Sequence, residues 1–204
     1  MAPNRAIQAT RSDGERSRRA ILGVAARVAT IHGLQHLSIA QLADEVGMSK
    51  SGLYAHFGSK EELQLATIDT AEEIYEQEVY APARATPPGV DGLIAMLDIH
   101  LDHLRRRVFP GGCFFDAAAS DLVSTTGPVR DRIVAFQDGW SALIRHHLVA
   151  ARDQGELPAD ADLEQLAFDV TAAMALAHAL LVFHGSEEAL DRAARSVRLR
   201  LGRA

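Results

Sequence analysis

The chain has one cysteine, Cys113, among its 204 residues, which excludes an intramolecular disulfide. It also lacks an apolar run near the roughly 20 residues that span a bilayer. The longest such run, 172–183, is shorter and contains His178. The N-terminus is polar and rich in arginine, without the apolar core of a secretory signal. We therefore expect a cytoplasmic protein with no membrane partner.

Catalytic signatures are missing as well. No nucleophile, base and orienting group occur in a recognisable triplet, and no glycine-rich phosphate loop follows a strand. His100 and His103 lie three residues apart on one predicted helix, close enough to share a metal ion, but no acidic or Cys partner is spaced nearby on that face. We expect no enzyme, no cofactor and no metal site. A small helical metal-binding protein or enzyme that uses these two histidines stays an alternative.

Net positive charge is confined to one end of the chain. The net charge of −6 argues by itself against a nucleic-acid partner. Residues 1–60, however, carry eight Arg or Lys residues and four acidic ones, a net +4, so the remainder carries −10. Of the 21 basic residues only Lys50 and Lys60 are lysines. A basic module on an acidic body is expected when one end meets phosphate, although an ordinary solvated basic face is the alternative.

Helical periodicity dominates the sequence, and no stretch alternates between apolar and polar residues as a strand would, so we predict an all-α fold. The predicted organisation is a flexible tail at 1–12, an N-terminal three-helix module at 13–60, a connecting helix at 59–80 and a helical body at 81–204. Pro82, Pro87 and Pro88 are expected to end the connecting helix. The predicted helices are 13–32, 38–46, about two turns from 49, 59–80, 90–107, 113–122, 127–153, 161–183 and 186–201.

Residues 38–56 have the mechanics of a helix-turn-helix, in which a second helix orients a third whose first turn enters a DNA major groove. Ser38 with Gln41 and Ser59 with Glu62 form capping boxes, and Ser49 is expected to cap the third helix. Small Ser51 and Gly52 permit close approach to base edges. Ser49, Tyr54 and Lys60 suit phosphate contacts, and Lys50 suits either a guanine edge or a phosphate. Alternatively Tyr54 and His56 cap a small core, but Leu53 and Phe57 already fill its positions.

On these residues the chain resembles the tetracycline-repressor (TetR) family. The similarity extends over about 16–65 without a gap and includes Ile21-Leu22, Ala25-Ala26, Gly33, Leu37-Ser38-Ile39, Leu42-Ala43, Val46-Gly47, Ser49-Lys50, Leu53-Tyr54, His56-Phe57, Ser59-Lys60 and Glu61-Glu62-Leu63. A weaker similarity to one branch of TetR C-terminal domains runs from Gly111 to Ala119 and from Gly127 to Asp131.

The resemblance implies a homodimer that binds a palindromic double-stranded DNA operator as an N-terminal helix-turn-helix domain with a C-terminal ligand-binding and dimerisation domain. It implies repression relieved by a small-molecule effector, and the sequence leaves activation open. The family's DNA contacts fall on Ser38, Ala40, Gln41, Ser49, Lys50, Ser51, Gly52, Tyr54, His56 and Lys60. Two positions depart from the family: Ala40 stands where Arg is frequent, and Gly52 where a side chain is usual, so a relative's operator does not transfer.

The body is predicted to hold the effector. Candidate pocket residues are apolar or amphipathic groups on body helices, each of which could equally be core: Met96, His100, Cys113, Phe114, Phe136, Trp140, Met174 and His178. Few charges accompany them, which favours an apolar or aromatic ligand. Cys113 is either a buried structural thiol or, at a helix start, an oxidant sensor in a redox-responsive regulator. His178 is either a satisfied core histidine or a polar group of the pocket.

The last two helices are predicted to form a four-helix dimer bundle with a partner. The alternative is a fully buried central helix in a monomer. The apolar arc of helix 161–183 is wider than one internal face needs: Leu166, Val170, Ala173, Met174, Ala177, Leu180 and Leu181.

Overall fold

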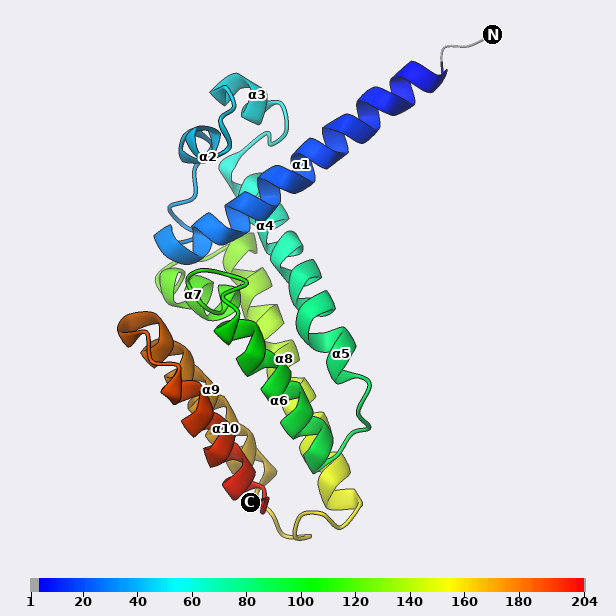
Figure 1. The fold of residues 1–204 in the computed structure, drawn as a ribbon, viewed down its shortest axis with the longest axis vertical. Coiled ribbons are helices and arrows are strands. Elements are labelled where there is room, and N and C mark those ends of the chain that lie inside the picture. Colours follow the sequence, from blue (N-terminus) through cyan, green and yellow to red (C-terminus); the bar gives the residue numbers. More distant parts are fainter. Residues whose placement is uncertain (1–3, 204) are drawn as a thin grey trace.

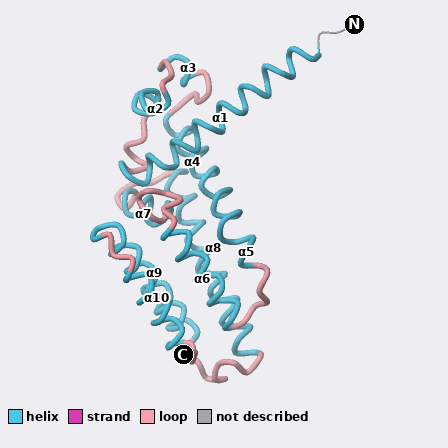
Figure 2. The backbone as a smooth tube through the Cα atoms, viewed as in Figure 1, coloured by secondary structure: helices cyan, strands magenta, loops and turns pink. Residues whose placement is uncertain are grey.

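The structure, a computed structural model, describes residues 4–203 and their side chains from residue 14 onward. These residues form helices and connecting loops and contain no strand (Figure 2). The all-α fold predicted from periodicity is thus confirmed. Figure 1 shows an elongated molecule, with the N-terminal helices at one end and the C-terminus at the other.

The N-terminal helices are α1 (Asn4–His32), α2 (Ile39–Val46) and α3 (Lys50–Tyr54), followed by the connector α4 (Lys60–Tyr75). The body contains α6 (Val90–Arg105), α7 (Phe114–Asp121), α8 (Pro128–Asp153), α9 (Leu163–His184) and α10 (Glu188–Arg200). These boundaries lie within a few residues of the predicted ones, except at the start of α1 and the end of α4.

The first helix begins much earlier than predicted. We expected a flexible tail at 1–12 and a helix from about Asp13, yet α1 begins at Asn4. Residues 4–12 contain no Pro or Gly, and five of the nine are Arg, Ala or Gln, which favour helix, so local propensity extends α1 toward the N-terminus. The first three residues of the predicted tail lie outside the described residues.

The connector also continues further than predicted. The π-helical turn η1 (Glu76–Tyr80) follows α4, and the short helix α5 (Ala81–Ala83) follows η1. Pro82 therefore lies inside the helical segment rather than ending it. It lies in the first turn of α5, directly after η1, and the chain stays helical through it.

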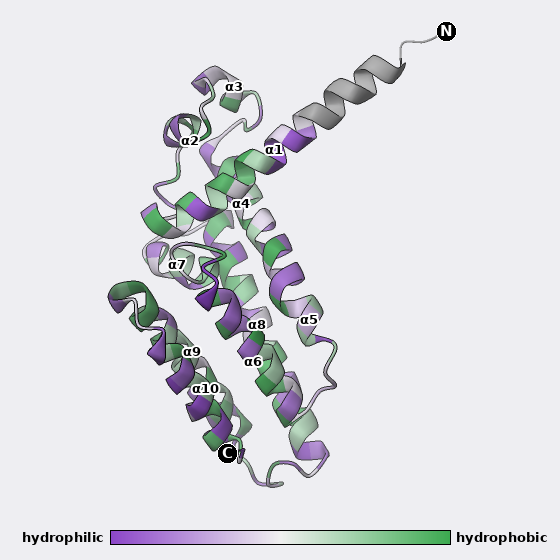
Figure 3. Cartoon of the chain, in the orientation of Figure 1, coloured by the Kyte–Doolittle hydropathy of each residue, from purple (hydrophilic) through white to green (hydrophobic). Residues whose placement is uncertain are grey.

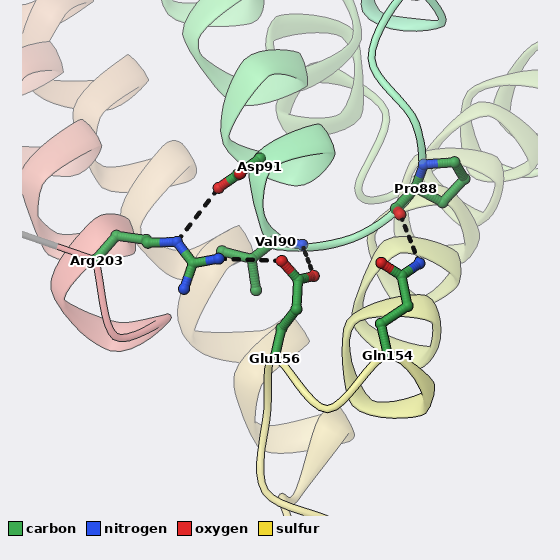
Figure 4. A network of polar contacts seen from close by, with 6 residues as sticks. All are labelled: Pro88, Val90, Asp91, Gln154, Glu156 and Arg203. Atoms are coloured by element: carbon green, nitrogen blue, oxygen red, sulfur yellow. Dashed lines mark hydrogen bonds and ion pairs between the residues drawn. The ribbon is translucent and has the colours of Figure 1, made fainter.

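A polar network closes the far end of the body, where three chain segments meet (Figure 4). Arg203 lies 3.3 Å from Asp91 and 3.0 Å from Glu156. The other Glu156 oxygen accepts from the backbone N–H of Val90 at 2.9 Å, which satisfies a free donor at the start of α6. The C-terminal segment is thereby fixed to the start of α6 and the end of α8.

Helix α9 is the most apolar element. Within the described residues it alone is long and apolar enough, by length and composition, to cross a membrane. We expected no membrane-spanning segment because no uninterrupted apolar run is long enough. Helix α9 is nevertheless apolar on average, although it contains Glu164 and Asp169. One side of α9 packs on the body through Leu166, Val170 and Met174, and in Figure 3 the C-terminal end of α9 is hydrophobic while the viewer's side of α10 is largely hydrophilic.

Candidate nucleic-acid interface and interior cavity

The predicted DNA-contact residues lie on α2, α3, their N-caps and the first residue of α4, with His56 in the turn after α3, at the end of the molecule opposite the C-terminus (Figure 1). Tyr54 is 59% exposed, which removes the alternative in which it caps a small core. The remaining exposed members are Ala40, Ser49, Lys50, Ser51 and Lys60, and the half-buried ones are Ser38, Gln41, Gly52 and His56.

Serine caps set the boundaries of these helices. The Oγ atoms of Ser38, Ser49 and Ser59 each accept a backbone N–H three residues later, at 3.1–3.2 Å. In a capping box, the residue three positions after the cap also accepts a hydrogen bond from the cap's backbone N–H. Neither predicted box contains this second hydrogen bond. Glu62 accepts from Gly58 rather than from the cap itself, at 3.0 Å. Gln41 has no side-chain hydrogen bond within the described residues, which leaves its amide available to a partner.

Arg18, on α1, holds the end of α3 in place, a role that sequence reasoning missed. Its guanidinium donates to the His56 carbonyl oxygen at 3.2 Å and lies 4.6 Å from the centre of the Phe57 ring. Hydrogen bonding and cation–π attraction thus fix α1 against the turn after α3. In the sequence Arg18 was one basic residue among several, and only its approach across 38 residues of chain distinguishes it.

The N-terminal helices contact the body through the end of α1. The Gly111 N–H donates to the Thr30 hydroxyl at 3.1 Å, and Arg27 donates to the Val108 carbonyl at 3.2 Å. A Cβ at Gly111 would lie 1.9 Å from the Thr30 carbonyl oxygen, so only glycine permits this approach. Nearby, Asp121 of α7 accepts from the Gln35 N–H at 2.5 Å.

A cavity of about 260 Å³ lies inside the body, between α4, α6, α7, α8 and α9. Its wall contains four aromatic side chains, Tyr75, Phe115, Phe136 and Trp140. His100 and Asp116 add polar groups, and the other lining residues are Cys113, Gln137, Ser141, Thr171, Met174 and Ala175. An aromatic wall with a few polar groups is typical of a site for a small organic ligand.

Five of the eight predicted pocket residues line this cavity: His100, Cys113, Phe136, Trp140 and Met174. Three do not. Met96 borders a separate cavity with Tyr80 and Leu143. Phe114 is buried against Phe109, because α7 turns Phe115 instead toward the cavity.

His178 is the third residue outside the cavity lining. Its Nε2 lies 3.4 Å from the Gly111 carbonyl oxygen and its Nδ1 lies 3.5 Å from an Asp116 oxygen. A Cβ at Gly112 would lie 2.4 Å from Nε2, so the glycine pair leaves room for this ring. His178 therefore sits between the 111–112 turn and α7.

Tyr75 is the most important cavity residue that sequence reasoning missed. Its side chain is 2% exposed, and its hydroxyl lies 2.5 Å from Nδ1 of His100. Burial raises the pKa of Tyr75 well above its ordinary value. Burial also lowers the pKa of His100 to about 3, with smaller contributions from His103 and His178, so this imidazole is neutral near pH 7. The inward spacing of Ile68, Ala71 and Tyr75 could have indicated the residue.

His103 does not complete a metal site with His100. Both of its ring nitrogens are buried without a hydrogen-bond partner, and its ring lies among those of Tyr75 and Phe109. Across the described residues no group of three or more His, Cys, Asp or Glu side chains is placed to hold a metal ion. Burial lowers the pKa of His103 to about 4.

The Cys113 thiol is 4% exposed at the start of α7. Burial raises its pKa well above the ordinary value, and the neighbouring Asp116 raises it further. Since the thiolate is the reactive form, this position disfavours fast reaction with an oxidant.

A helix-turn-helix presented at one end of an all-helical body with an interior cavity defines a class of DNA-binding transcriptional regulators. Two family models match: "Bacterial regulatory proteins, tetR family" at residues 21–67 and "Tetracyclin repressor-like, C-terminal domain" at residues 89–197. The chain belongs to the TetR family, as its sequence resemblance predicted. Members of this family are transcriptional regulators rather than enzymes, which confirms that expectation too.

Similar proteins match between about three quarters and nearly all of the chain. The regulator SrpR of Pseudomonas putida is 24% identical over 156 residues, 76% of this chain and 70% of SrpR. The crystal structure of a TetR regulator from Chloroflexus aurantiacus matches with a TM-score of 0.85 and 27% identity, over 94% of this chain and 96% of that one. AibR, solved with isovaleryl coenzyme A and operator DNA, has the same fold, with a TM-score of 0.70 and 22% identity over 89% and 96%.

Proposed function

We propose that this regulator is a cytoplasmic homodimeric repressor, released from a palindromic operator by a small apolar or aromatic ligand bound in the interior cavity. The observation that carries the proposal is the placement of α4. This helix begins at Lys60 on the predicted DNA-binding face and ends at Tyr75 in the cavity wall. Its 16 residues span about 24 Å.

Ligand contact at Tyr75 would therefore act on α4, the helix that directly follows the helix-turn-helix in the chain. The π-helical turn η1 directly follows Tyr75, and such turns are frequent at functional sites. On the other side, Arg132 of α8 lies 2.8 Å from Asp69 and 2.7 Å from Glu72 of α4. Release requires that the ligand bind more tightly to the arrangement whose reading helices do not match the operator spacing.

Dimerisation is supported by apolar side chains left on the surface of α9 and α10. Phe183 is 81% exposed, and Phe168, Leu176 and Leu199 are each more than 60% exposed. A large exposed apolar surface of this kind marks a protein interface. Two reading helices about 34–36 Å apart would then contact successive major grooves of a palindrome.

The test is selection of binding sites from random and genomic DNA with the purified protein. We expect a palindromic site, and we expect naphthalene-sized aromatic compounds to weaken its binding. Recovery of sites without two-fold symmetry would contradict the dimer, and transcription from the selected promoter distinguishes repression from activation. Oxidant-dependent release that Cys113→Ser abolishes would instead favour the redox-responsive alternative.

Phosphate contacts give a prediction of their own. Lys60→Ala should weaken binding to all DNA sequences and reduce the slope of log affinity against log salt by about 1, because one fewer phosphate is neutralised. The measurement is fluorescence anisotropy at several salt concentrations. Arg84→Ala, at an exposed position directly after α5, is the control and should leave the slope unchanged. An unchanged slope for Lys60→Ala would place this lysine off the interface.

A further inference from the structure

A buried hydrogen bond in the cavity wall joins the Tyr75 hydroxyl to the His100 imidazole and fixes the positions of their polar hydrogen atoms. Both side chains are at most 4% exposed, and the phenol oxygen lies 2.5 Å from Nδ1 of the imidazole. The raised pKa of Tyr75 keeps its phenol protonated, and the lowered pKa of His100 keeps its imidazole neutral. A neutral imidazole has one nitrogen that donates and one that accepts.

The buried phenol proton of Tyr75 determines which imidazole nitrogen of His100 accepts a hydrogen bond and which one donates. Within the described residues, Nδ1 of His100 is the single hydrogen-bond partner of the Tyr75 hydroxyl. If Nδ1 carried the proton, it would donate to the phenol oxygen and leave the buried O–H of Tyr75 without an acceptor. Nδ1 must therefore accept, and the imidazole proton resides on Nε2.

Nε2 has no hydrogen-bond partner of its own within the described residues, and His100 lines the cavity. The imidazole lies 5.8 Å from the ring of Tyr75 and 5.3 Å from that of Trp140 between ring centres, in a cavity that Phe115 and Phe136 also line. A ligand that fills the cavity but lacks an acceptor would leave this donor unsatisfied in an apolar site, which disfavours its binding.

We infer that the cavity selects neutral aromatic molecules carrying a hydrogen-bond acceptor of the aryl ketone type, with the ring among the aromatic side chains and the carbonyl oxygen accepting from Nε2 of His100. This inference rests on the proposed function and names its ligand class. An anion gains no counter-charge from a neutral imidazole and meets the Asp116 carboxylate in the cavity wall. Burial raises the pKa of that carboxyl group, which makes it a weaker partner for a cation.

The test uses four probes of one shape. They are 2-acetylnaphthalene as the neutral acceptor, 2-ethylnaphthalene without an acceptor, 2-naphthoate as the anion and 1-(2-naphthyl)ethylammonium as the cation. Calorimetry gives the affinities, and quenching of Trp140, the single tryptophan of the chain, reports binding in the cavity. We expect the ketone to bind about tenfold more tightly than the ethyl compound, as one satisfied buried donor would give.

Two variants show whether His100 and Tyr75 set this preference. His100→Phe should bring the ketone down to the affinity of the ethyl compound while the ethyl compound keeps its own. Tyr75→Phe removes the phenol proton that fixes the tautomer, so the ketone preference should shrink without loss of the ethyl compound. In the ligand-free protein, ¹⁵N shifts of His100 should show the Nε2–H tautomer.

Each contrary outcome overturns the inference. These are an Nδ1–H tautomer, equal affinity for ketone and ethyl compound, tightest binding of the carboxylate or the ammonium, or no binding of any probe. Operator binding is measured in parallel without ligand. If the palindrome is bound but the ketone is not preferred, the ligand class is wrong and the proposed regulator stands. If no DNA is bound, the proposed function fails whatever the probes show.

Discussion

At the scale of single residues, buried histidines make the fold sensitive to pH. The pKa of His103 is lowered to about 4 in the folded chain, against about 6.5 when unfolded. Between these values the unfolded chain binds more protons, so the free energy of unfolding decreases as pH falls from 6.5 toward 4. His103 contributes up to about 1.4 kcal/mol per pH unit in that window, and His100 acts in the same direction.

His103→Leu should therefore make the dependence of unfolding free energy on pH shallower by about 1 kcal/mol per unit between pH 6 and 4.5. At pH 7 it should be neutral or stabilising by about 1 kcal/mol, because two unsatisfied ring nitrogens leave the core. The measurement is urea unfolding at several pH values. His103→Gln is the control: it also removes the titration but keeps a buried polar group, so it should not gain stability at pH 7.

Glycine at position 111 allows the N-terminal helices to pack on the body. Gly111→Ala would place Cβ 1.9 Å from the Thr30 carbonyl oxygen and should destabilise the protein by about 2 kcal/mol. Gly139→Ala is the matched control on α8, where a Cβ meets no atom within 4 Å, and it should stabilise by up to about 1 kcal/mol. Thermal unfolding of both variants checks the pair. Equal changes would mean that the 111–112 turn can move away from α1 without cost.

At the scale of elements, short helices depend on their caps. Helix α2 has eight residues, too few to be stable alone, and Ser38 satisfies one of its free N–H groups. Ser38→Ala should cost about 1 kcal/mol of unfolding free energy and weaken operator binding, since α2 orients α3. Chemical denaturation and anisotropy are the measurements. Ser124→Ala is the control, at an exposed loop serine without a hydrogen bond in the described part of the chain. If Ser38→Ala lowers the unfolding free energy no more than Ser124→Ala does, the Ser38 cap does not stabilise α2.

At the scale of the whole molecule, the exposed apolar surface of α9 and α10 is proposed to pair two subunits. Phe183→Glu should convert the dimer to a monomer of 22.0 kDa and lower operator affinity by more than tenfold, because each half-site would then be bound singly. Light scattering after size exclusion gives the mass. Val123→Glu changes a 75% exposed residue in the loop after α7 and should leave the dimer intact. A Phe183→Glu protein that stays dimeric would place the interface elsewhere.

The local signals in this sequence were sufficient for most of the fold. Serine caps and apolar periodicity predicted the helices because both depend on neighbours three or four residues away. The same local rules gave wrong boundaries at the start of α1 and at the end of the connector, where no side-chain cap sets the length. Helix α1 begins at Asn4, and the connector continues past Pro82. Five of the eight predicted pocket residues line the cavity because aromatic and amphipathic types favour such sites, whereas Phe114 and Phe115 could not be told apart before the rotation of α7 was known.

By itself the sequence determined the family, the all-helical class and the residues that occupy α3, because these follow from residue type at fixed spacing along the chain. Only the tertiary structure decided what depends on approach between distant segments. It brought Arg18 to the end of α3, Gly111 against Thr30, and Tyr75 to within hydrogen-bond distance of His100. The last of these contacts fixes a proton on Nε2 of a neutral imidazole. No residue pattern specifies that proton, since it follows from a buried phenol having one acceptor within reach.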